Sequence, residues 1–299
     1  MSGFSLDWLD LREAADHRAR DDSLLMRARD WLAQQASAGR PCIIDLGSGS
    51  GSTLRAFAAC ADINQWAWRL VDADAELLAE SVRRHGSLQA LQSCQQDLAA
   101  VAELPLAGVQ MISASALFDL VSAEFIAALL EAMGSSAQKP ALYSALNYDG
   151  TTRFSPEHPL DDQVLAAFNR DQQRDKGFGK ALGPAATACL AEQCAQAGYS
   201  VELASSHWRL GGKGLMDDEI NRNSSAATGG TKYGGDNGHE GDGLLVSAWV
   251  DGIAAAVADD EQIDTLALQD WQTFRQAHAA SGLCIVGHMD LLALPLDHE

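Results

Sequence analysis

The sequence predicts a doubly wound α/β fold, in which helices cover both faces of a mainly parallel sheet. Short apolar runs alternate with segments of helical spacing along most of the 299 residues, which is typical of parallel strands joined by helices. The first apolar run, residues 42–46, continues into a glycine-rich turn and a helical segment. In such sheets, a strand followed by a glycine-rich turn and a helix commonly forms the binding site for a nucleotide-like ligand. No internal repeat is visible, and we expect one domain over residues 1–299.

The first half of the chain supplies four of the expected strands. Residues 7–38 have helical spacing and account for an expected helical cap over residues 1–38. Asp74 stands where it can cap the helix that follows it. The expected strands are residues 42–46, 66–71, 88–94 and 109–113, and the expected helices are residues 53–60, 74–85 and 117–133.

The second half keeps the alternation but interrupts it with three inserts. Residues 147–180 form a polar insert after a strand, and residues 244–281 form a helical insert before the last strand. Residues 211–243 are rich in Gly, Asn, Asp and Ser, which predicts a flexible loop. The expected strands are residues 141–146, 199–204 and 284–294, and the expected helices are residues 160–174, 182–197, 244–258 and 262–280.

The charge balance excludes some classes of partner. Asp and Glu number 41 against 21 Lys and Arg, giving a formal net charge of −20. A surface this acidic repels phosphates, so we expect no nucleic-acid partner. No apolar run is long enough to cross a bilayer, and the first residues lack the pattern of a secretory signal, so we expect a cytoplasmic protein without a membrane partner. The acidic excess fits either a solvated surface or a cationic partner.

The glycine-rich turn is the most informative segment. Gly47, Gly49 and Gly51 are spaced G-x-G-x-G, whereas a dinucleotide site needs a third glycine where this chain has Ser52. Asp45 precedes the turn at the end of a buried strand. An acid in this place attracts a cationic amine and repels a pyrophosphate.

A second acid follows at the end of the next strand. Asp72 lies about 20 residues beyond the glycines, where a carboxylate can accept hydrogen bonds from both hydroxyls of a ribose. Sites for NAD use the same arrangement. Asp72 therefore favours a nucleoside ligand without choosing between cofactors.

Residues 45–51 resemble motif I of class I S-adenosylmethionine-dependent methyltransferases, in which D-x-G-x-G-x-G holds the methionine half of the cofactor. Further segments resemble a largely uncharacterised bacterial group of these enzymes, and the resemblance covers most of the chain outside residues 211–243. It implies the cofactor and leaves the substrate open. The segments are residues 8–20, 68–72, 115–121, 175–183 and 286–292.

The resemblance also implies a fold and further cofactor residues. The fold is a Rossmann-like sheet of seven strands whose last strand is antiparallel. Asp97 and Leu98 would lie at the adenine, and Ser113 beside the cofactor; the alternative for Asp97 is an acid that only stabilises a turn. Residues 1–38 would form a lid, with Arg12 and Arg20 meeting the cofactor carboxylate. The alternative for these arginines is a ladder of i,i+4 charge pairs along one helix face. No metal is expected.

Residues that act on the acceptor should lie just past the later strands, because the protein must align the acceptor and take its proton. Asp119 is the first candidate, although an acid there also suits a helix start. In the acceptor-site insert, residues 147–180, the stretch ending at Asn169 resembles the acceptor-binding stretch of histidine Nα-methyltransferases. His158 is either a base or a solvated loop histidine. Residues 288–290 are expected to be structural, because the active end of an antiparallel last strand should be its start.

The sequence thus predicts transfer of a methyl group from S-adenosylmethionine to nitrogen or oxygen of a small polar molecule. One alternative is an NAD-dependent oxidoreductase, which Ser52 and Asp45 disfavour. Another is a regulator that binds S-adenosylmethionine without catalysis. The sequence does not indicate an oligomeric state.

Overall fold

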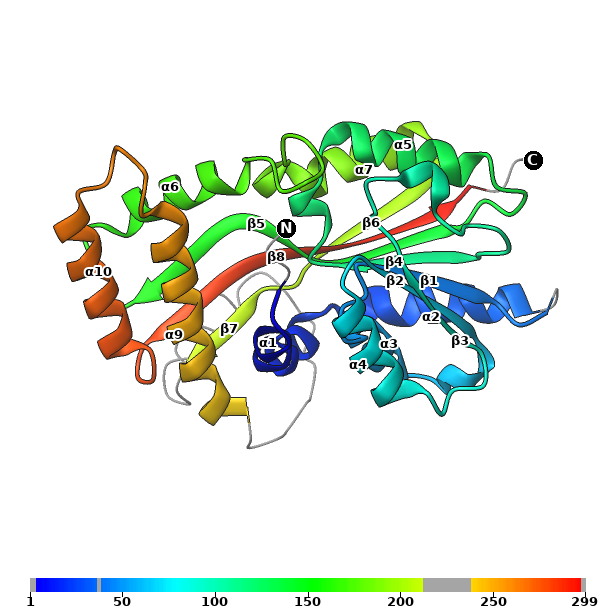
Figure 1. Cartoon of the computed structure of the whole chain (residues 1–299), viewed down its shortest axis with the longest axis horizontal. Helices are drawn as coiled ribbons and strands as arrows, with labels where there is room; N and C mark the ends of the chain where they lie inside the picture. The colour runs from blue at the N-terminus through cyan, green and yellow to red at the C-terminus, as the bar shows by residue number, and fades with distance from the viewer. Residues whose placement is uncertain (1–3, 37–38, 212–237, 297–299) are drawn as a thin grey trace, which may run out of the picture.

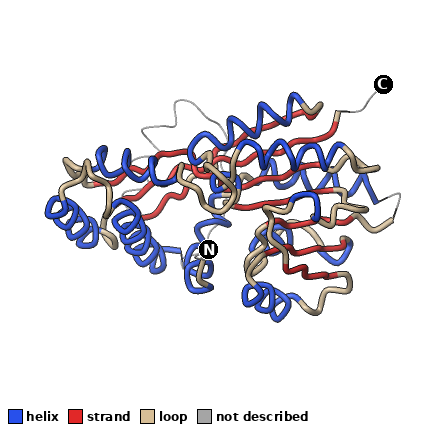
Figure 2. Tube along the Cα trace, turned by 45° about the horizontal axis from the view of Figure 1, so that its top comes forward, coloured by secondary structure: helices blue, strands red, loops and turns tan. Residues whose placement is uncertain are grey.

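A computed structural model describes residues 4–36, 39–211 and 238–296, and it contains an eight-stranded sheet between two layers of helices (Figures 1 and 2). The strands follow one another in the order β3-β2-β1-β4-β5-β8-β6, and β7 also pairs with β8. The first five strands are parallel, and β8 runs antiparallel to its three neighbours. The strands are β1 Cys42–Leu46, β2 Ala67–Asp72, β3 Leu91–Gln95, β4 Met111–Ser115, β5 Ala141–Ser155, β6 Tyr199–Ser205, β7 Trp208–Gly211 and β8 Leu283–Pro295.

The helices divide between the faces of the sheet. α5 and α7 cover one face, α2, α3 and α4 cover the other, and each layer encloses an apolar core against the strands. A third core lies where α1, α6, α9 and α10 meet the far ends of β5, β7 and β8. The helices are α1 Leu6–Ala19, α2 Asp22–Gln35, α3 Ser52–Ala58, α4 Ala75–His85, α5 Ala123–Gly134, α6 Asp161–Gln172, α7 Ala186–Gln196, α9 Gly238–Val257 and α10 Thr265–His278.

Local capping chemistry sets several of these boundaries. Asp74 accepts the backbone N–H groups of two residues in the first turn of α4, which confirms the predicted cap. The helical segment expected over residues 7–38 is two helices, because Arg20 leaves the helical conformation and Asp21 caps α2. The helix expected from residue 117 begins only after Ser122, whose hydroxyl caps α5. The residues before it form a 3-10 turn, Phe118–Leu120.

The largest difference from expectation is the length of β5. Its expected end was residue 146, but the strand continues to Ser155, so the first part of the expected insert 147–180 belongs to the sheet. The pairing with β8 is interrupted by an irregularity between Tyr148 and Thr152. This bulge lies over Gly287, where a Cβ atom would come within 2.0 Å of a side-chain oxygen of the bulge.

β8 is equally long, and two short strands share its other side. β6 pairs with residues 289–295 of β8, whereas β7 pairs with residues 283–286. The sheet therefore has eight strands where seven were expected, and three of them extend beyond its carboxyl edge. Of the expected loop 211–243, residues 212–237 lie outside the described residues, Gly211 ends β7, and residues 238–243 belong to α9.

The described part of the chain offers neither a membrane-spanning helix nor a metal-binding cluster. None of the described helices has both the length and the apolar character needed to cross a membrane. Within the same part of the chain, no three His, Cys, Asp or Glu side chains stand close enough together to hold a metal ion.

Candidate functional site

The glycine turn lies at the carboxyl edge of the sheet, between β1 and α3. Gly47, Gly49 and Gly51 all have positive φ angles, which a residue with a Cβ atom adopts only under strain. Gly51 has a φ of +88°, and a Cβ atom there would lie 2.8 Å from the hydroxyl of Ser81 on α4. The turn therefore needs glycine both for its conformation and for its closeness to α4.

Asp72 holds the turn from the end of β2. One of its carboxylate oxygens accepts the backbone N–H of Gly49 at 2.8 Å, and the other accepts the N–H of Asp74 at 3.0 Å. The side chain remains only partly buried. It can therefore fix the turn and still meet a ligand beside it.

Asp45 is buried at the end of β1, 1% exposed, beneath the glycine turn. Its Oδ1 accepts the hydroxyl of Ser113 on β4 at 2.7 Å, and no described residue makes a well-aligned hydrogen bond to its buried Oδ2. Burial raises the pKa of this carboxyl to about 6, against the lowering effects of Ser113 and Arg20. The Oδ2 atom of Asp45 can thus accept a further hydrogen bond from a ligand.

Arg20 reaches the same place from the end of α1. It is 5% exposed, and its Nη2 donates to the hydroxyl of Ser115 at 2.7 Å. The Ser115 hydroxyl in turn lies 2.9 Å from that of Thr53 in α3. Nε and Nη1 of Arg20 are buried without a well-aligned partner, although Tyr143 and Asp290 lie near enough to act on its charge. A cation with free donors therefore stands close to the unpaired oxygen of Asp45.

α1 covers the glycine turn and is tied to it by ion pairs. Glu13 pairs with Arg55 of α3, which also donates to the backbone oxygen of Ser50 in the turn. Nearer the start of α1, a side-chain carbon of Leu9 lies 3.1 Å from the place of a Cβ atom on Gly49. The first helix therefore lies over the turn as the expected lid would.

The predicted adenine residues lie beyond the end of β3. Asp97 is exposed and accepts the N–H of Ala99 at 3.0 Å, whereas Leu98 is buried. Leu98 and Leu117 both approach Gly47 within 4.0 Å of its Cβ position. Together these residues form an apolar wall beside the turn with one carboxylate at its outer rim.

Arg12 and Arg20, expected to act together, point to different places. Arg12 makes a two-point ion pair with Asp16, with N···O distances of 2.8 and 3.1 Å, so the i,i+4 alternative describes its contacts. Its guanidinium lies 4.9 Å from the ring centre of Trp208 and acts on the charge of Asp119. Arg12 therefore belongs with the acceptor candidates, and Arg20 stands at the glycine turn.

Asp119 lies in the 3-10 turn after β4 and not at a helix start. It is 8% exposed, and its Oδ1 is buried without a hydrogen-bond partner. Burial raises its pKa to about 6, while its own backbone N–H and the Arg12 charge act in the opposite direction. A buried carboxylate of this pKa can accept a proton near neutral pH.

The other two acceptor candidates have separate positions. Asn169 on α6 donates to the backbone oxygen of Gly150 at 2.8 Å and so supports the β5 bulge. His158 lies beyond the end of β5, where its ring packs on Phe274 and its Nδ1 accepts the N–H of Leu160. The structure therefore does not bring His158 to the carboxyl edge, and its largely buried ring is not the solvated loop histidine of the alternative.

Sequence reasoning missed the residues that the two long strands carry to this edge. His288 and Asp290 stand in the middle of β8 because that strand starts well beyond the edge. Asp290 accepts the N–H of Leu146 and of Asp21, and burial, with the charges of Arg12 and His207, lowers the pKa of His288 well below 6.5. Residues 288–290 were expected to be structural because the start of the strand was expected to be its active end; the structure places them at this edge, where the hydrogen bonds of Asp290 hold the backbone. The length of the strand predicted over residues 284–294 was the available signal, since it needs an equally long partner.

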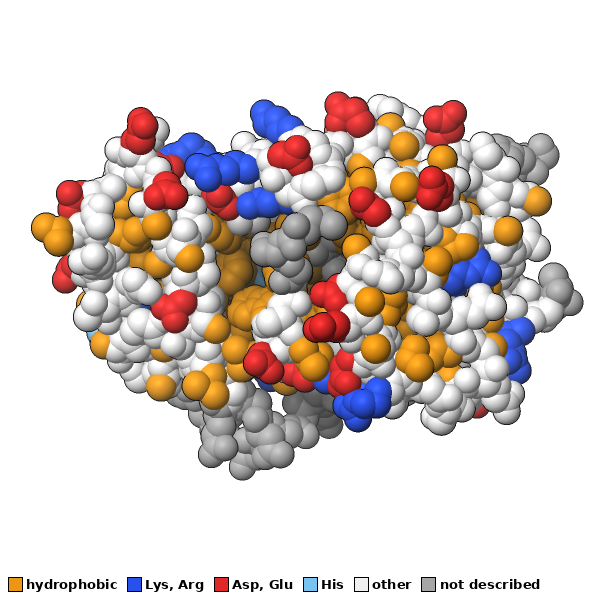
Figure 3. Space-filling model, viewed as in Figure 1, with side chains coloured by type: hydrophobic (Ala, Val, Ile, Leu, Met, Phe, Trp, Pro, Cys, Tyr) orange, Lys and Arg blue, Asp and Glu red, His pale blue; other side chains and the backbone are white. Residues whose placement is uncertain are grey.

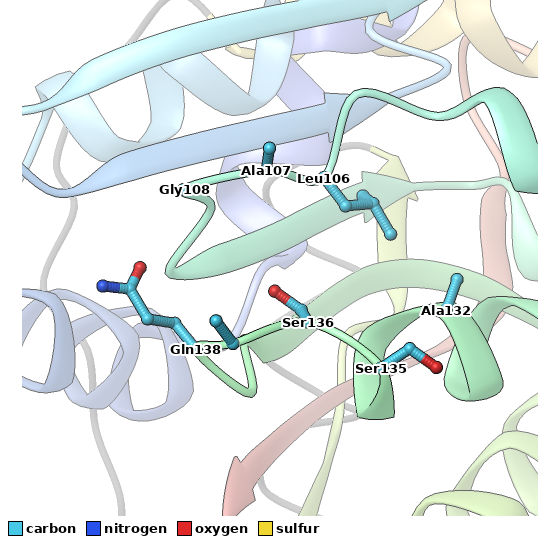
Figure 4. A pocket seen from close by; sticks show the side chains of 8 residues that line it. Leu106, Ala107, Gly108, Ala132, Ser135, Ser136 and Gln138 are labelled. Atoms are coloured by element: carbon cyan, nitrogen blue, oxygen red, sulfur yellow. The ribbon is translucent and has the colours of Figure 1, made fainter.

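The surface has a hollow on the side of the extended strands and a depression at the opposite edge of the sheet. Figure 3 shows a hollow with hydrophobic side chains between α9 and the start of α1, on the side of the extended strands. Figure 4 shows a depression lined by small and polar residues, among them Gly108 and Ser136. These residues precede β4 and β5, so that depression lies at the amino edge, opposite the glycine turn.

Neither protein-family models nor curated proteins give a match to this sequence. Among solved structures, the cyclopropane synthase MmaA2 from Mycobacterium tuberculosis is 12% identical over 97% of this chain and 94% of its own, with a TM-score of 0.46. The magnesium protoporphyrin IX methyltransferase ChlM from Synechocystis PCC 6803 is 14% identical over 61% of this chain and 76% of its own, with a TM-score of 0.37. An O-methyltransferase family protein from Burkholderia thailandensis is 14% identical over 61% and 54%, with a TM-score of 0.40.

Because these TM-scores are below 0.5, the fold assignment depends on the strand order itself. Five parallel strands are followed by a last strand that is inserted, antiparallel, between the fifth and sixth. The described strands therefore form a mainly parallel, Rossmann-like sheet with one antiparallel strand inserted next to its last strand.

Proposed function

We propose that the protein is an S-adenosylmethionine-dependent methyltransferase. The observation that carries the proposal is the pair of buried, incompletely bonded charges at the glycine turn. Asp45 offers an unpaired carboxylate oxygen, and Arg20 offers unpaired guanidinium donors. An α-amino acid end, with its ammonium and carboxylate, supplies the donor that Asp45 lacks and the acceptor that Arg20 lacks.

The residues around the turn also fit a nucleoside. Asp72 is partly exposed beside the turn and can accept ribose hydroxyl groups. Leu98 and Leu117 form the apolar wall for a base, with Asp97 at its rim. Nucleoside and amino acid ends thus meet at one turn, as S-adenosylmethionine requires.

The bound cofactor would supply an electrophilic methyl group on a sulfonium. The chain itself must align an acceptor, exclude water and receive a proton where the acceptor carries one. Lid helix α1 excludes water above the turn, and Asp119 is the proton acceptor with a buried free oxygen. We propose transfer to nitrogen or oxygen of a small polar molecule.

An NAD-dependent oxidoreductase fits these residues less well. A pyrophosphate at the turn would lie over the buried carboxylate of Asp45, and charge repulsion opposes that arrangement. The carboxylate of Asp72 is compatible with both cofactors and does not decide between them.

Calorimetry with S-adenosylhomocysteine and with NADH tests the proposal. We expect S-adenosylhomocysteine to bind with one site per chain and NADH not to bind. Asp45→Asn should weaken S-adenosylhomocysteine binding by about tenfold to a hundredfold, the loss of one charge-assisted hydrogen bond. The exposed Asp259→Asn is the matched control and should bind like wild type. Binding of NADH without S-adenosylhomocysteine contradicts the proposal.

A further inference from the structure

Six aromatic rings from six different elements meet beyond the carboxyl edge of the sheet, and we call them the aromatic cluster. His288 on β8 lies 5.0 Å from Trp208 and 6.2 Å from Tyr148, measured between ring centres. Trp249 on α9 lies 5.4 to 6.2 Å from three of the other rings. The cluster consists of Trp8, Tyr148, Phe168, Trp208, Trp249 and His288.

The cluster is unlike an ordinary apolar core because several of its polar atoms are buried without partners. The indole N–H groups of Trp8 and Trp249 and the Nδ1 of His288 have no hydrogen-bond partner among the residues that the structure describes. Buried polar groups of this kind are normally satisfied, by protein, water or ligand. Three such atoms around one group of rings indicate a binding place.

Asp119 borders this cluster. Its charge acts on Tyr148, and Arg12, which stacks on Trp208, acts on Asp119 and on His288. The hollow of Figure 3 lies between α9 and the start of α1, and these two helices carry Trp249 and Trp8 of the cluster. Acidic side chains gather at its lower rim, over α1.

Two of the charged or titratable groups at the cluster, Arg12 and His288, are accounted for by their surroundings. Arg12 is neutralised by its two-point pair with Asp16, which also accepts the indole N–H of Trp208 at 2.9 Å. His288 is held neutral, because its pKa lies well below 6.5. Among the described residues, the ionised Asp119 has neither a hydrogen-bond donor on Oδ1 nor an ion-pair partner. A ligand that satisfies the Asp119 carboxylate must therefore bring a positively charged hydrogen-bond donor.

We propose that the methyl acceptor is a cationic amine on a flat apolar body, with its ammonium group on Asp119 and its body against the aromatic cluster. This inference rests on the proposed methyltransferase function and narrows its acceptor to nitrogen. Aromatic faces attract cations and pack well against flat apolar surfaces, so the rings and the carboxylate favour the same ligand.

Asp119 then has a defined proton to receive. An ammonium nitrogen has no free electron pair and cannot act as a nucleophile. When one N–H proton passes to the Asp119 carboxylate, the carboxylate becomes a neutral carboxylic acid and the amine regains its electron pair. The proton leaves Asp119 to water when the site opens, which restores the carboxylate. In the transfer itself, the electron pair of the amine would form the N–C bond while the bond from methyl to sulfur breaks with its pair left on sulfur, so the sulfonium charge passes to the methylated nitrogen and no other reactant is needed.

Three probes with a similar body and different charge test the proposal by calorimetry on protein saturated with S-adenosylhomocysteine. The probes are phenethylamine, 2-phenylethanol and 3-phenylpropionate. We expect the amine to bind at least about tenfold more tightly than the alcohol, and the acid to bind most weakly. Asp119→Asn should reduce the affinity for the amine to that for the alcohol, whereas the exposed Asp259→Asn should not. Trp249→Ala should weaken the amine and the alcohol alike.

The outcomes separate this inference from the function on which it rests. If S-adenosylhomocysteine does not bind, the proposed function fails. If it binds but the alcohol or the acid equals the amine, or Asp119→Asn leaves the order of affinities unchanged, the amine acceptor is wrong. Binding of none of the three probes also overturns it. Unchanged S-adenosylhomocysteine affinity in Asp119→Asn shows that this variant is folded.

Discussion

Replacing Asp119 by asparagine should stabilise the protein at neutral pH. Burial raises the pKa of Asp119 from its usual 3.8 to about 6, so folding is opposed whenever this carboxyl is ionised. At 1.36 kcal/mol per pKa unit, the ionised group costs about 3 kcal/mol at pH 7.5 and about half as much at pH 5. The stability of wild type is thus complete below pH 3.8 and falls as the pH rises through about 6. Asp119→Asn keeps the shape and removes the ionisation.

Urea unfolding followed by tryptophan fluorescence measures this effect, since Trp208 and Trp271 are fully buried. We expect the gain in the free energy of unfolding of Asp119→Asn over wild type to be about 1.5 kcal/mol larger at pH 7.5 than at pH 5. A buried amide without partners has its own cost, which is the same at both pH values and cancels in this difference. The exposed Asp259→Asn should show no such dependence. A gain that is equal at both pH values, or larger at pH 5, would refute the reasoning.

Two other substitutions test how the fold builds the site. Gly287→Ala places a Cβ atom 2.0 Å from the Thr151 hydroxyl in the β5 bulge. We therefore expect the free energy of unfolding in urea to fall by about 3 kcal/mol or more. A fall below about 0.5 kcal/mol would show that Gly287 does not hold the bulge in place. Glu13→Gln removes the ion pair between α1 and Arg55 and should speed dissociation of S-adenosylhomocysteine several-fold in stopped-flow measurements. An unchanged dissociation rate would mean that α1 does not limit release.

The glycine turn and its acids could be predicted because their chemistry is local. A buried strand, three glycines with positive φ and Asp45 lie within one short segment, and Asp74 caps its helix through neighbouring backbone groups. The position of Asp119 in a 3-10 turn could not be predicted in the same way. The helix was expected to start at residue 117, but Ser122 caps it, so the helix starts later and Asp119 precedes it.

The acceptor side was harder to predict because long-range pairing decides it. The Asp149-Gly150 dipeptide indicates a turn, yet the chain passes it as a bulge because β8 offers a partner strand with Gly287 opposite. The pairing carries His288 and Tyr148 to the edge of the sheet, although they are distant in sequence. No local pattern at either residue indicates that they meet, so the aromatic cluster emerges only from the folded chain.

The central claim is that the protein transfers a methyl group from S-adenosylmethionine to a small molecule. The most direct test is incubation of the full chain with a metabolite extract and S-adenosylmethionine labelled in the methyl group, followed by mass spectrometry. The account predicts a labelled small-molecule product that carries the label on an amine nitrogen and that is lost with Asp45→Asn. Tight binding of S-adenosylhomocysteine without any labelled product would contradict the claim and favour a non-catalytic regulator.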